Sequence, residues 1–317
     1  MTNFCLLPSA FCPLSLCRSC RVLPYGSREK TYIYAMPEKL STWINSHQFP
    51  EVFYRFPGLL PLQWFTSRVL YHRCWLIRRE VNRELRKFSA GFAFLDAGCG
   101  AGDFLIPFAR KFTPGWFTGL DQSPGNIHMI NYFCRKKRVT NVSLLNGDIM
   151  ETAFGDLFDV ILCASVLQYL DNYQQVLDRF AENLKPGGHL IIYVPVNYHR
   201  RIPGYERLKR RFFREVDYEC GKPFRNDLSF EGLNGDLREA GFTVTGHRSL
   251  YGPVGQIAYE ISSLALLLIQ KVPWIWSGLF TLIYFVAIHP FILLMLLIDF
   301  YSPDKQGNGL LITAARN

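Results

Sequence analysis

The sequence contains little charge for its length and no recognisable nucleic-acid-binding pattern. Only 19% of its 317 residues are Asp, Glu, Lys or Arg, whereas 49% are hydrophobic. A typical soluble domain has about 25% charged residues. No zinc-finger, homeodomain or RNP-type pattern occurs, so we expect no nucleic-acid partner. Acidic residues are fewer than basic residues, which leaves a net charge of +9. Basic charge beside high apolar content favours an anionic membrane or an acidic substrate as partner.

The chain also lacks a disulfide framework and a metal-binding pattern. Its nine cysteines are an odd number, and four of them crowd the first twenty residues (Cys5, Cys12, Cys17 and Cys20). The others stand singly in apolar segments, which indicates reduced thiols in a cytosol-like compartment. Cys17 and Cys20 form a CxxC pair, but no further ligands follow at zinc-binding spacing. We therefore predict no metal.

The first 90 residues have no strand-and-helix alternation. Residues 1–35 contain no acidic residue before Glu29. They are either an acid-poor targeting peptide or an untranslated segment ahead of a start at Met36, so we predict an unstructured or mis-annotated segment. Within 36–90, an irregular arm rich in aromatics and proline should precede an amphipathic helix at 67–88. The basic face of that helix either faces solvent or lies against an anionic membrane.

From residue 91 onward, apolar strands alternate with helices. The predicted strands are 92–98, 116–121, 142–148, 158–165, 189–196, 242–250 and 307–317. The predicted helices are 101–112, 123–138, 173–188 and 228–241, with Ser123 as an N-cap and Pro186-Gly187-Gly188 as a helix stop. Strands that are apolar throughout indicate a parallel sheet covered on both faces. The sequence thus predicts a doubly wound α/β core over 91–252, completed by a last strand within 302–317, with ligands bound beyond the carboxyl ends of the strands.

An apolar insert, residues 253–301, separates the last two predicted strands. Residues 272–298 contain no charged side chain, and a run above about 18 such residues is a transmembrane candidate. Trp274, Trp276 and Tyr301 flank it as interfacial aromatics would. A shorter apolar segment that carries Glu260 precedes it.

Because both flanking strands should join one sheet, a single membrane crossing is excluded. Three arrangements remain: a helical hairpin that crosses, a re-entrant segment that bends at His289-Pro290, or helices that cover the core or a partner subunit.

The stretch "FLDAGCGAGDF", residues 94–104, places an acid before three glycines at every second position. A GxGxxG dinucleotide fingerprint would need glycine where the chain has Asp103. The second and third strands end in Asp121 and Asp148, and "LKPGGHLII" leads into the fifth. In this order, the motifs over 92–196 resemble those of the class I S-adenosylmethionine-dependent methyltransferases. The resemblance implies a Rossmann-like, seven-stranded methyltransferase sheet, here with a hydrophobic helical insert before the last strand.

The resemblance also implies S-adenosylmethionine as cofactor and a set of residues that bind it. The glycines would let the backbone approach the methionine half, Asp96 would organise its amino group, and Asp121 would accept from the ribose hydroxyls. Gln122, Asp148 and Ile149 would contact the adenine, and Ala164 would line the cleft. The predicted cofactor residues are Asp96, Gly98, Cys99, Gly100, Gly102, Asp121, Gln122, Asp148, Ile149 and Ala164. Cys99 is expected to fill space in the loop rather than act as a nucleophile.

An oxygen acceptor would also need a base within hydrogen-bond reach. Tyr169, Tyr198 and His199 lie near the ends of predicted strands and are the candidates, with packing or lid structure as the alternative explanation for each. Residues 197–228 are strongly basic and are expected to form a lid that contacts anionic headgroups.

Together these features predict a membrane-associated methyltransferase whose catalytic domain faces the cytoplasm. Its acceptor would be lipophilic or lipid-linked, and membrane lipids would be its partners. Two alternatives stay open: a soluble small-molecule methyltransferase whose apolar helices form a homodimer, and a cofactor-binding scaffold without transfer activity.

Overall fold

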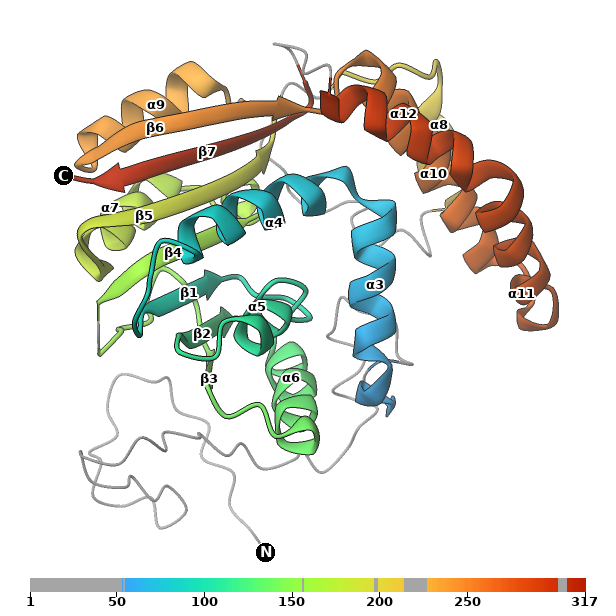
Figure 1. Ribbon diagram of the computed structural model, residues 1–317. Helices are drawn as coiled ribbons and strands as arrows, with labels where there is room; N and C mark the ends of the chain where they lie inside the picture. The colour runs from blue at the N-terminus through green and yellow to red at the C-terminus, as the bar shows by residue number, and fades with distance from the viewer. Residues whose placement is uncertain (1–52, 54, 156, 197–198, 214–226, 302–306) are drawn as a thin grey trace, which may run out of the picture.

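A computed structural model describes residues 53, 55–155, 157–196, 199–213, 227–301 and 307–317. A seven-stranded sheet forms its centre, with the strand order β3-β2-β1-β4-β5-β7-β6 (Figure 1). The strands are β1 (Ala93–Ala97), β2 (Trp116–Asp121), β3 (Val142–Asn146), β4 (Phe158–Ala164), β5 (Leu184–Pro195), β6 (Phe242–Leu250) and β7 (Gly309–Arg316). The predicted doubly wound sheet is confirmed.

The helices precede, connect and follow these strands. They are η1 (Pro57–Leu59), α3 (Leu60–Leu70), α4 (His72–Leu85), α5 (Leu105–Lys111), α6 (Pro124–Lys137), η2 (Leu167–Tyr169), α7 (Tyr173–Asn183), α8 (Tyr205–Phe213), α9 (Phe230–Glu239), α10 (Pro253–Lys271), α11 (Trp274–Ile283), the π-helical turn η3 (Tyr284–Ile288) and α12 (His289–Tyr301). Ser123 caps α6 as predicted, because its side chain accepts from the Asn126 amide.

Successive side chains of each strand enter opposite layers of the core. Phe94 and Phe117 pack with α4, α5 and α6. Leu95 and Ile161 pack with α7 and α9 on the other face. This alternation follows from the two-residue period of a strand. It explains why the strands are apolar throughout: both faces are covered by helices.

The sheet is mixed, which corrects the prediction that it is parallel. β1 to β5 are parallel neighbours, whereas β7 lies antiparallel between β5 and β6. The period of a strand does not reveal its direction, so the sequence pattern could not distinguish the two cases. Neighbouring antiparallel strands can be joined by a hairpin connection at one edge. Leu250 and Pro195 each pair with Gly309, so the insert leaves and returns at the carboxyl ends of β5 and β6.

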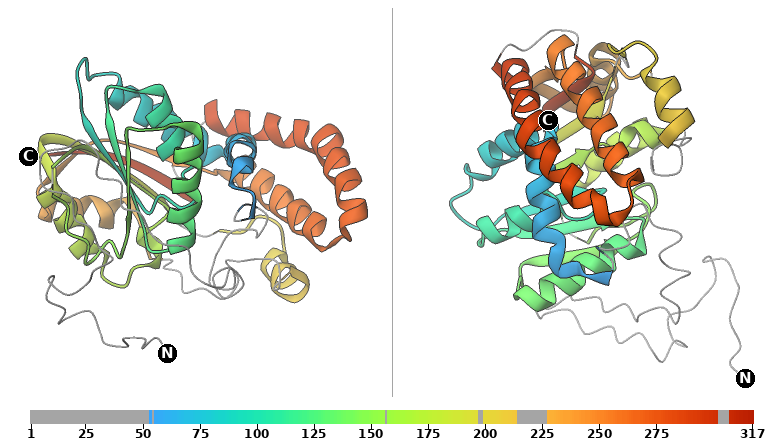
Figure 2. Two further views of the ribbon diagram at one scale, coloured as in Figure 1. Left: turned by 90° about the horizontal axis from the view of Figure 1, so that it is seen from below. Right: turned by 90° about the vertical axis from the view of Figure 1, so that its right-hand side faces the viewer.

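The insert folds into a helical hairpin. α10 runs outward, α11 forms the tip, and α12 returns beside α10 (Figure 2). The helix bends between α11 and α12, where η3 stands directly before His289-Pro290. A π-helical turn and a proline are both known causes of such bends. The bend lies at the position named for the re-entrant arrangement, and the membrane arrangement itself stays a prediction. The hairpin projects away from the sheet.

The arm and the basic helix differ from the prediction. Residues 60–70, which include part of the predicted irregular arm, form α3, and the predicted helix 67–88 breaks at Tyr71, whose backbone is extended. Leu60, Trp64 and Ser67 form the buried stripe of α3, and their spacing was the signal that could have revealed it. Pro186 and Gly187 also lie inside β5, in a bulged entry opposite β4, rather than in a helix end.

Candidate functional site

The glycine loop connects β1 to α5 at the carboxyl edge of the sheet. Gly98, Gly100 and Gly102 all have positive φ, a conformation that side chains with a Cβ rarely adopt. A Cβ on Gly98 would overlap Val166, whereas a Cβ on Gly100 would meet nothing within 4 Å. The amides of Gly98 and Cys99 both donate to the Leu120 carbonyl, at 2.8 and 2.9 Å. The loop is thus fixed to β2 on one side and open at Gly100 on the other.

Asp121, at the end of β2, joins the loop to α6. Its Oδ2 accepts from the Gly100 amide at 2.8 Å. Its Oδ1 accepts from the Ser123 amide at 2.9 Å and from Asn126 Nδ2 at 3.2 Å. A carboxylate offers about four acceptor positions, so the half-buried Asp121 keeps acceptor capacity on Oδ2. This capacity suits a hydroxyl of a ligand lying against Gly100. The sequence did not single out Asn126.

Asp96 lies under the loop at the end of β1 and is almost completely buried. Within the described part of the chain, its Oδ2 has no hydrogen-bond partner. Burial raises the pKa of Asp96 to about 8, a Leu105 amide opposes this, and the negative charges of Asp121 and Asp103 add to it. A cationic group placed against Asp96 would satisfy the orphaned oxygen and lower this pKa. The residues present therefore fit a cofactor that carries an amino group.

Helix α3 covers the loop, a feature that the sequence analysis missed. Trp64 is buried, and its indole nitrogen donates to the Ala101 carbonyl at 3.0 Å. Its ring meets Phe133 of α6 edge-on, with centroids 4.8 Å apart. An aromatic side chain fixed in this way excludes water from one side of the loop.

The other predicted cofactor residues lie around the same edge. Asp148 is exposed, and its Oδ1 accepts from the Met150 amide at 2.8 Å, which fixes the turn after β3. Ile149 is buried in the core layer of α7. Gln122 is exposed at the start of α6, and Ala164 is half-buried at the end of β4. The sheet topology thus brings all ten predicted residues to the carboxyl ends of β1 to β4.

Cys99 is buried within the loop. Burial, followed by the charges of Asp121 and Asp96, raises the pKa of its thiol well above the usual value. The thiolate is the nucleophilic form of cysteine, so this environment suppresses such a role. The geometry agrees with the predicted space-filling role.

The three candidate bases are not brought together. Tyr169 ends η2, just beyond β4, and is 37% exposed. His199 follows β5, where its backbone amide donates to Asn308 and its carbonyl accepts from the Asn308 side chain. Tyr198 lies outside the described residues, as do residues 1–35 and most of the second half of the predicted lid.

The described part of the basic lid docks on the insert. Glu260 of α10 is fully buried and accepts from the amides of Arg201 and Ile202, at 3.0 and 2.7 Å. Gln256 donates to the same carboxylate at 2.8 Å. The Tyr205 hydroxyl lies 2.7 Å from Ser263 Oγ. The lone acid of this apolar segment therefore anchors the segment that leads into α8.

The returning helix of the hairpin is anchored at the opposite side. Asp299 Oδ2 lies 3.0 Å from His72 Nδ1 of α4 and accepts from the Tyr251 amide at 3.0 Å. Arg248 donates to the Phe300 carbonyl. These contacts join the base of the hairpin to α4 and to the end of β6.

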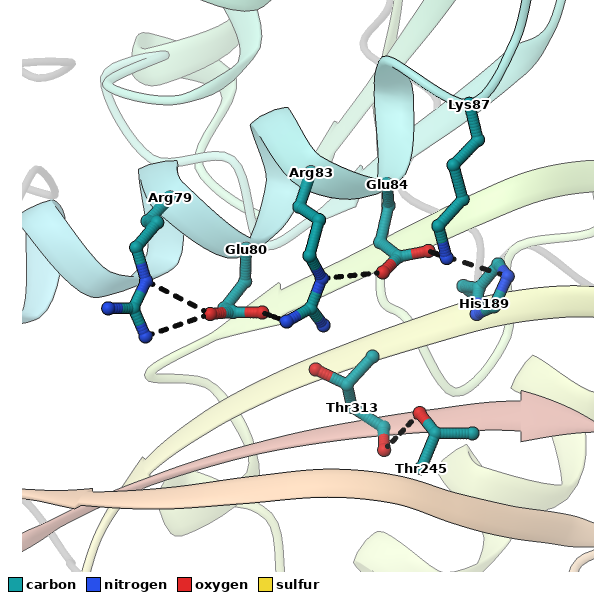
Figure 3. A network of polar contacts seen from close by, with 8 residues as sticks. All are labelled: Arg79, Glu80, Arg83, Glu84, Lys87, His189, Thr245 and Thr313. Atoms are coloured by element: carbon teal, nitrogen blue, oxygen red, sulfur yellow. Dashed lines mark hydrogen bonds and ion pairs between the residues drawn. The ribbon is translucent and has the colours of Figure 1, made fainter.

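Helix α4 carries a ladder of ion pairs above β5 and β7. Arg79, Arg83 and Lys87 surround the buried carboxylates of Glu80 and Glu84 (Figure 3). Each of these three cations therefore has an acidic partner, although the two carboxylates offset only two of the three positive charges. The predicted basic face is real, but this part of it serves α4 itself.

The comparisons with known proteins agree with this geometry. Residues 95–190 match the family described as "Methyltransferase domain". Demethylmenaquinone methyltransferase of Listeria welshimeri is 32% identical over 148 residues, which cover 46% of this chain and 62% of that protein. Ubiquinone biosynthesis O-methyltransferase of Rickettsia akari is 30% identical over 117 residues, 37% of this chain and 43% of that protein. The chain thus spans less than two thirds of the length of either relative.

A solved structure supports the fold itself. Phosphoethanolamine N-methyltransferase 2 of Haemonchus contortus, in complex with S-adenosyl-L-methionine, aligns with a TM-score of 0.51. The alignment covers 75% of this chain and 52% of that chain at 17% identity. The family match ends at residue 190, so it does not include the insert, whose first helix is α10.

Proposed function

We propose that this chain, which belongs to the class I S-adenosylmethionine-dependent methyltransferases, transfers a methyl group to a lipophilic, quinone-like acceptor that it takes from a membrane. One observation carries the proposal: the apolar hairpin leaves the sheet at the same edge as the glycine loop and Asp121. An acceptor held by the hairpin would therefore approach the end of the sheet where the cofactor binds. The quinone-biosynthesis relatives support the acceptor class.

S-adenosylmethionine is the cofactor of this family, and it supplies a methyl group on a positively charged sulfur that an acceptor atom takes by in-line displacement, leaving S-adenosylhomocysteine. Asp121 would hold the ribose, the loop at Gly100 would admit the methionine half, and Asp96 would face the amino group. Trp64 would keep water from the loop. Alignment in a dry site is the main contribution that an enzyme makes to such a displacement.

A hydroxyl acceptor would also have to lose a proton. Tyr169 and His199 remain our candidates for the base, with Tyr198 as the third. Each stands beyond the end of β4 or β5 in the chain, where the acceptor would enter.

The membrane part of the proposal rests on the surface of the hairpin. The helix Ile275–Tyr301 has 27 residues, and its most apolar window of 18 residues has a mean hydropathy of 2.4 and is only 22% buried. Every described side chain of α11 is at least partly exposed. Trp276 and Tyr301 are 56% and 77% exposed near its two ends. Large exposed apolar patches mark interaction sites.

A monotopic arrangement fits these elements better than a crossing. The segment that leads into the basic helix α8 docks on α10, where Glu260 accepts from the Arg201 and Ile202 amides and Ser263 contacts Tyr205, the first residue of α8. α10 could cross a bilayer only if the cations of α8 entered it as well, which is costly. We therefore place the outer faces of α11 and α12 in one leaflet. The predicted cytoplasmic orientation of the catalytic domain remains a prediction.

The test combines extraction with transfer. We expect the full chain to remain with membranes in high salt and to be released by detergent; release by salt alone would contradict embedding. Incubation with labelled S-adenosylmethionine and a lipid extract should place the label in a lipid-soluble product. A stable dimer that needs no detergent and methylates only water-soluble acceptors would favour the soluble alternative.

A matched pair of variants separates embedding from catalysis. Leu282→Ser with Val286→Ser should lower transfer to the membrane-borne acceptor at least tenfold, while the affinity for S-adenosylhomocysteine stays unchanged. The control pair Leu157→Ser with Trp116→Ser removes exposed apolar side chains elsewhere and should leave both quantities unchanged.

A further inference from the structure

A depression of about 480 Å³ lies between α3, α4 and α5. Four cations line it: Arg68 of α3, Arg78 of α4, and Arg110 and Lys111 of α5. Trp64 and Phe65 supply aromatic walls, and no acidic residue lines it. We refer to these four cations and their depression as the cationic pocket. None of the ten predicted cofactor residues lines the cationic pocket, which adjoins the cofactor site through Trp64.

The central cation of the pocket is held in place by the protein. Arg78 donates from Nη2 to the Asp103 carbonyl at 2.6 Å, and its guanidinium lies over Phe104 and Phe108, 5.8 and 5.7 Å from the ring centroids. Its Nε is buried without a hydrogen-bond partner in the described part of the chain. The guanidinium is therefore held in a fixed orientation, while its Nε–H group is still available to donate a hydrogen bond.

Like charges crowd the pocket. Burial, and after it the positive charge of Arg68, lowers the pKa of Arg78. Burial and the charges of Arg86 and Arg78 lower the pKa of Lys111. Asp103 stands next to Arg78, but burial raises the pKa of this carboxyl and weakens the compensation. An anion in the pocket would relieve the repulsion.

The cations of the pocket differ from those beside α4 in their acidic partners. Arg79, Arg83 and Lys87 are paired with carboxylates. Arg68 and Arg110 are exposed, and the described structure gives neither side chain an ion pair. The cationic pocket therefore gathers four positive charges with no acidic residue in its lining.

The surroundings of the pocket identify the source of the anion. Leu62 and Phe65 of α3 are 56% and 60% exposed, and Phe56 just before α3 is 60% exposed. α3 lies on the same side of the sheet as the hairpin (Figures 1 and 2). Exposed apolar side chains beside a cluster of cations are typical of surfaces that bind anionic membranes.

We propose that the cationic pocket binds the phosphate of an anionic lipid headgroup, while Leu62 and Phe65 enter the interface beside it. The site gives the enzyme a second membrane contact next to the hairpin. It extends the membrane part of the proposed function and does not depend on methyl transfer.

The test is flotation of the full chain with vesicles of phosphatidylcholine, alone or mixed with phosphatidylglycerol. Wild type should bind the mixed vesicles more tightly. We call the ratio of the affinity for mixed vesicles to the affinity for neutral vesicles the gain. The double variant Arg68→Gln with Arg110→Gln should reduce this gain about 10- to 30-fold and leave binding to neutral vesicles unchanged. The control variant Lys137→Gln with Arg238→Gln removes the same formal charge from α6 and α9 and should change the gain less than threefold. Unchanged affinity for S-adenosylhomocysteine shows that each variant is folded.

Three results would overturn the proposal. Equal losses in the two double variants would reduce the effect to net charge. If wild type binds inorganic phosphate tightly but binds anionic and neutral vesicles equally, the pocket would be assigned to a soluble anion. Binding of an RNA oligonucleotide that the pocket variant alone loses, with vesicle binding intact, would assign it to nucleic acid. The hairpin variant, by contrast, should weaken binding to both kinds of vesicle, so failure of the pocket and failure of hairpin embedding are distinguishable.

Discussion

Two pairs of buried or half-buried acids perform different tasks in this molecule. At the cofactor edge, Asp96 keeps an oxygen without a partner and Asp121 keeps acceptor capacity toward the opening at Gly100. At the hairpin base, Glu260 accepts from three donors, and Asp299 lies against His72 and accepts from a backbone amide.

The difference teaches how to separate function from structure in a buried carboxylate. Leaving a buried acceptor unsatisfied costs about 1–3 kcal/mol, so a chain that keeps one is prepared for a ligand. A buried acid that is fully paired within the protein fixes the fold. Each of the four acids can be tested against this distinction.

The largest effect is expected at Asp299. Asp299→Ala would remove the carboxylate that lies 3.0 Å from His72 Nδ1 and would leave the Tyr251 amide without an acceptor inside the protein, so the free energy of unfolding should fall by about 3–5 kcal/mol. Urea unfolding monitored by fluorescence measures this. His72→Ala should itself cost stability in either background, because its buried ring packs against Trp75, Tyr251 and Phe300. A double-mutant cycle of the two variants isolates the energy of the pair. A loss below about 1 kcal/mol would contradict the structural assignment.

Asp121 should affect binding more than folding. Asp121→Ala should weaken S-adenosylhomocysteine about 100-fold, or roughly 2.7 kcal/mol, because the charge-assisted bonds to the ribose are lost. Calorimetric titration measures the affinity. Asp159→Ala is the matched control, since Asp159 also accepts from a backbone amide, that of Ala93, but at the opposite edge of the sheet. Unchanged binding in Asp121→Ala would refute the site.

Asp96 should separate stability from binding. With its pKa raised to about 8, the folded state holds a proton that the unfolded state has lost between about pH 4 and pH 8, so stability falls as pH rises through this range. Asp96→Asn lacks this dependence. At pH 8 it should be more stable than wild type by about 1–3 kcal/mol and should bind the cofactor product at least tenfold more weakly. A pH series of urea melts tests the sign, and a variant advantage that is constant with pH would contradict it.

The smallest effect is expected at Glu260. Glu260→Gln keeps the shape but replaces one acceptor oxygen with a donor NH2 group. It therefore loses the charge and at least one bond from Arg201, Ile202 or Gln256, which should cost about 1 kcal/mol. Hydrogen exchange should accelerate in α8 and leave β1 unchanged. Equal exchange of α8 in both proteins would show that the lid is held by other contacts.

Much of the core was predictable because local patterns determine it. The apolar runs ending in Asp96 and Asp121, the glycine spacing and the Ser123 cap each act over a few residues. The roles of Trp64 and Asn126 were not predictable, because a tryptophan on a short helix and an asparagine after a cap have many ordinary explanations. Only their contacts with Ala101 and Asp121 give them meaning.

By itself, the sequence determined the alternating strands, the glycine loop and the presence of an apolar insert, since hydrophobic period and backbone freedom are local properties. The tertiary structure decided the direction of β7, which returns the insert to the cofactor edge. It also decided which cations have carboxylate partners beside α4 and which line the cationic pocket. Strand direction and charge pairing depend on partners far away in the chain, and only the folded chain brings those partners together.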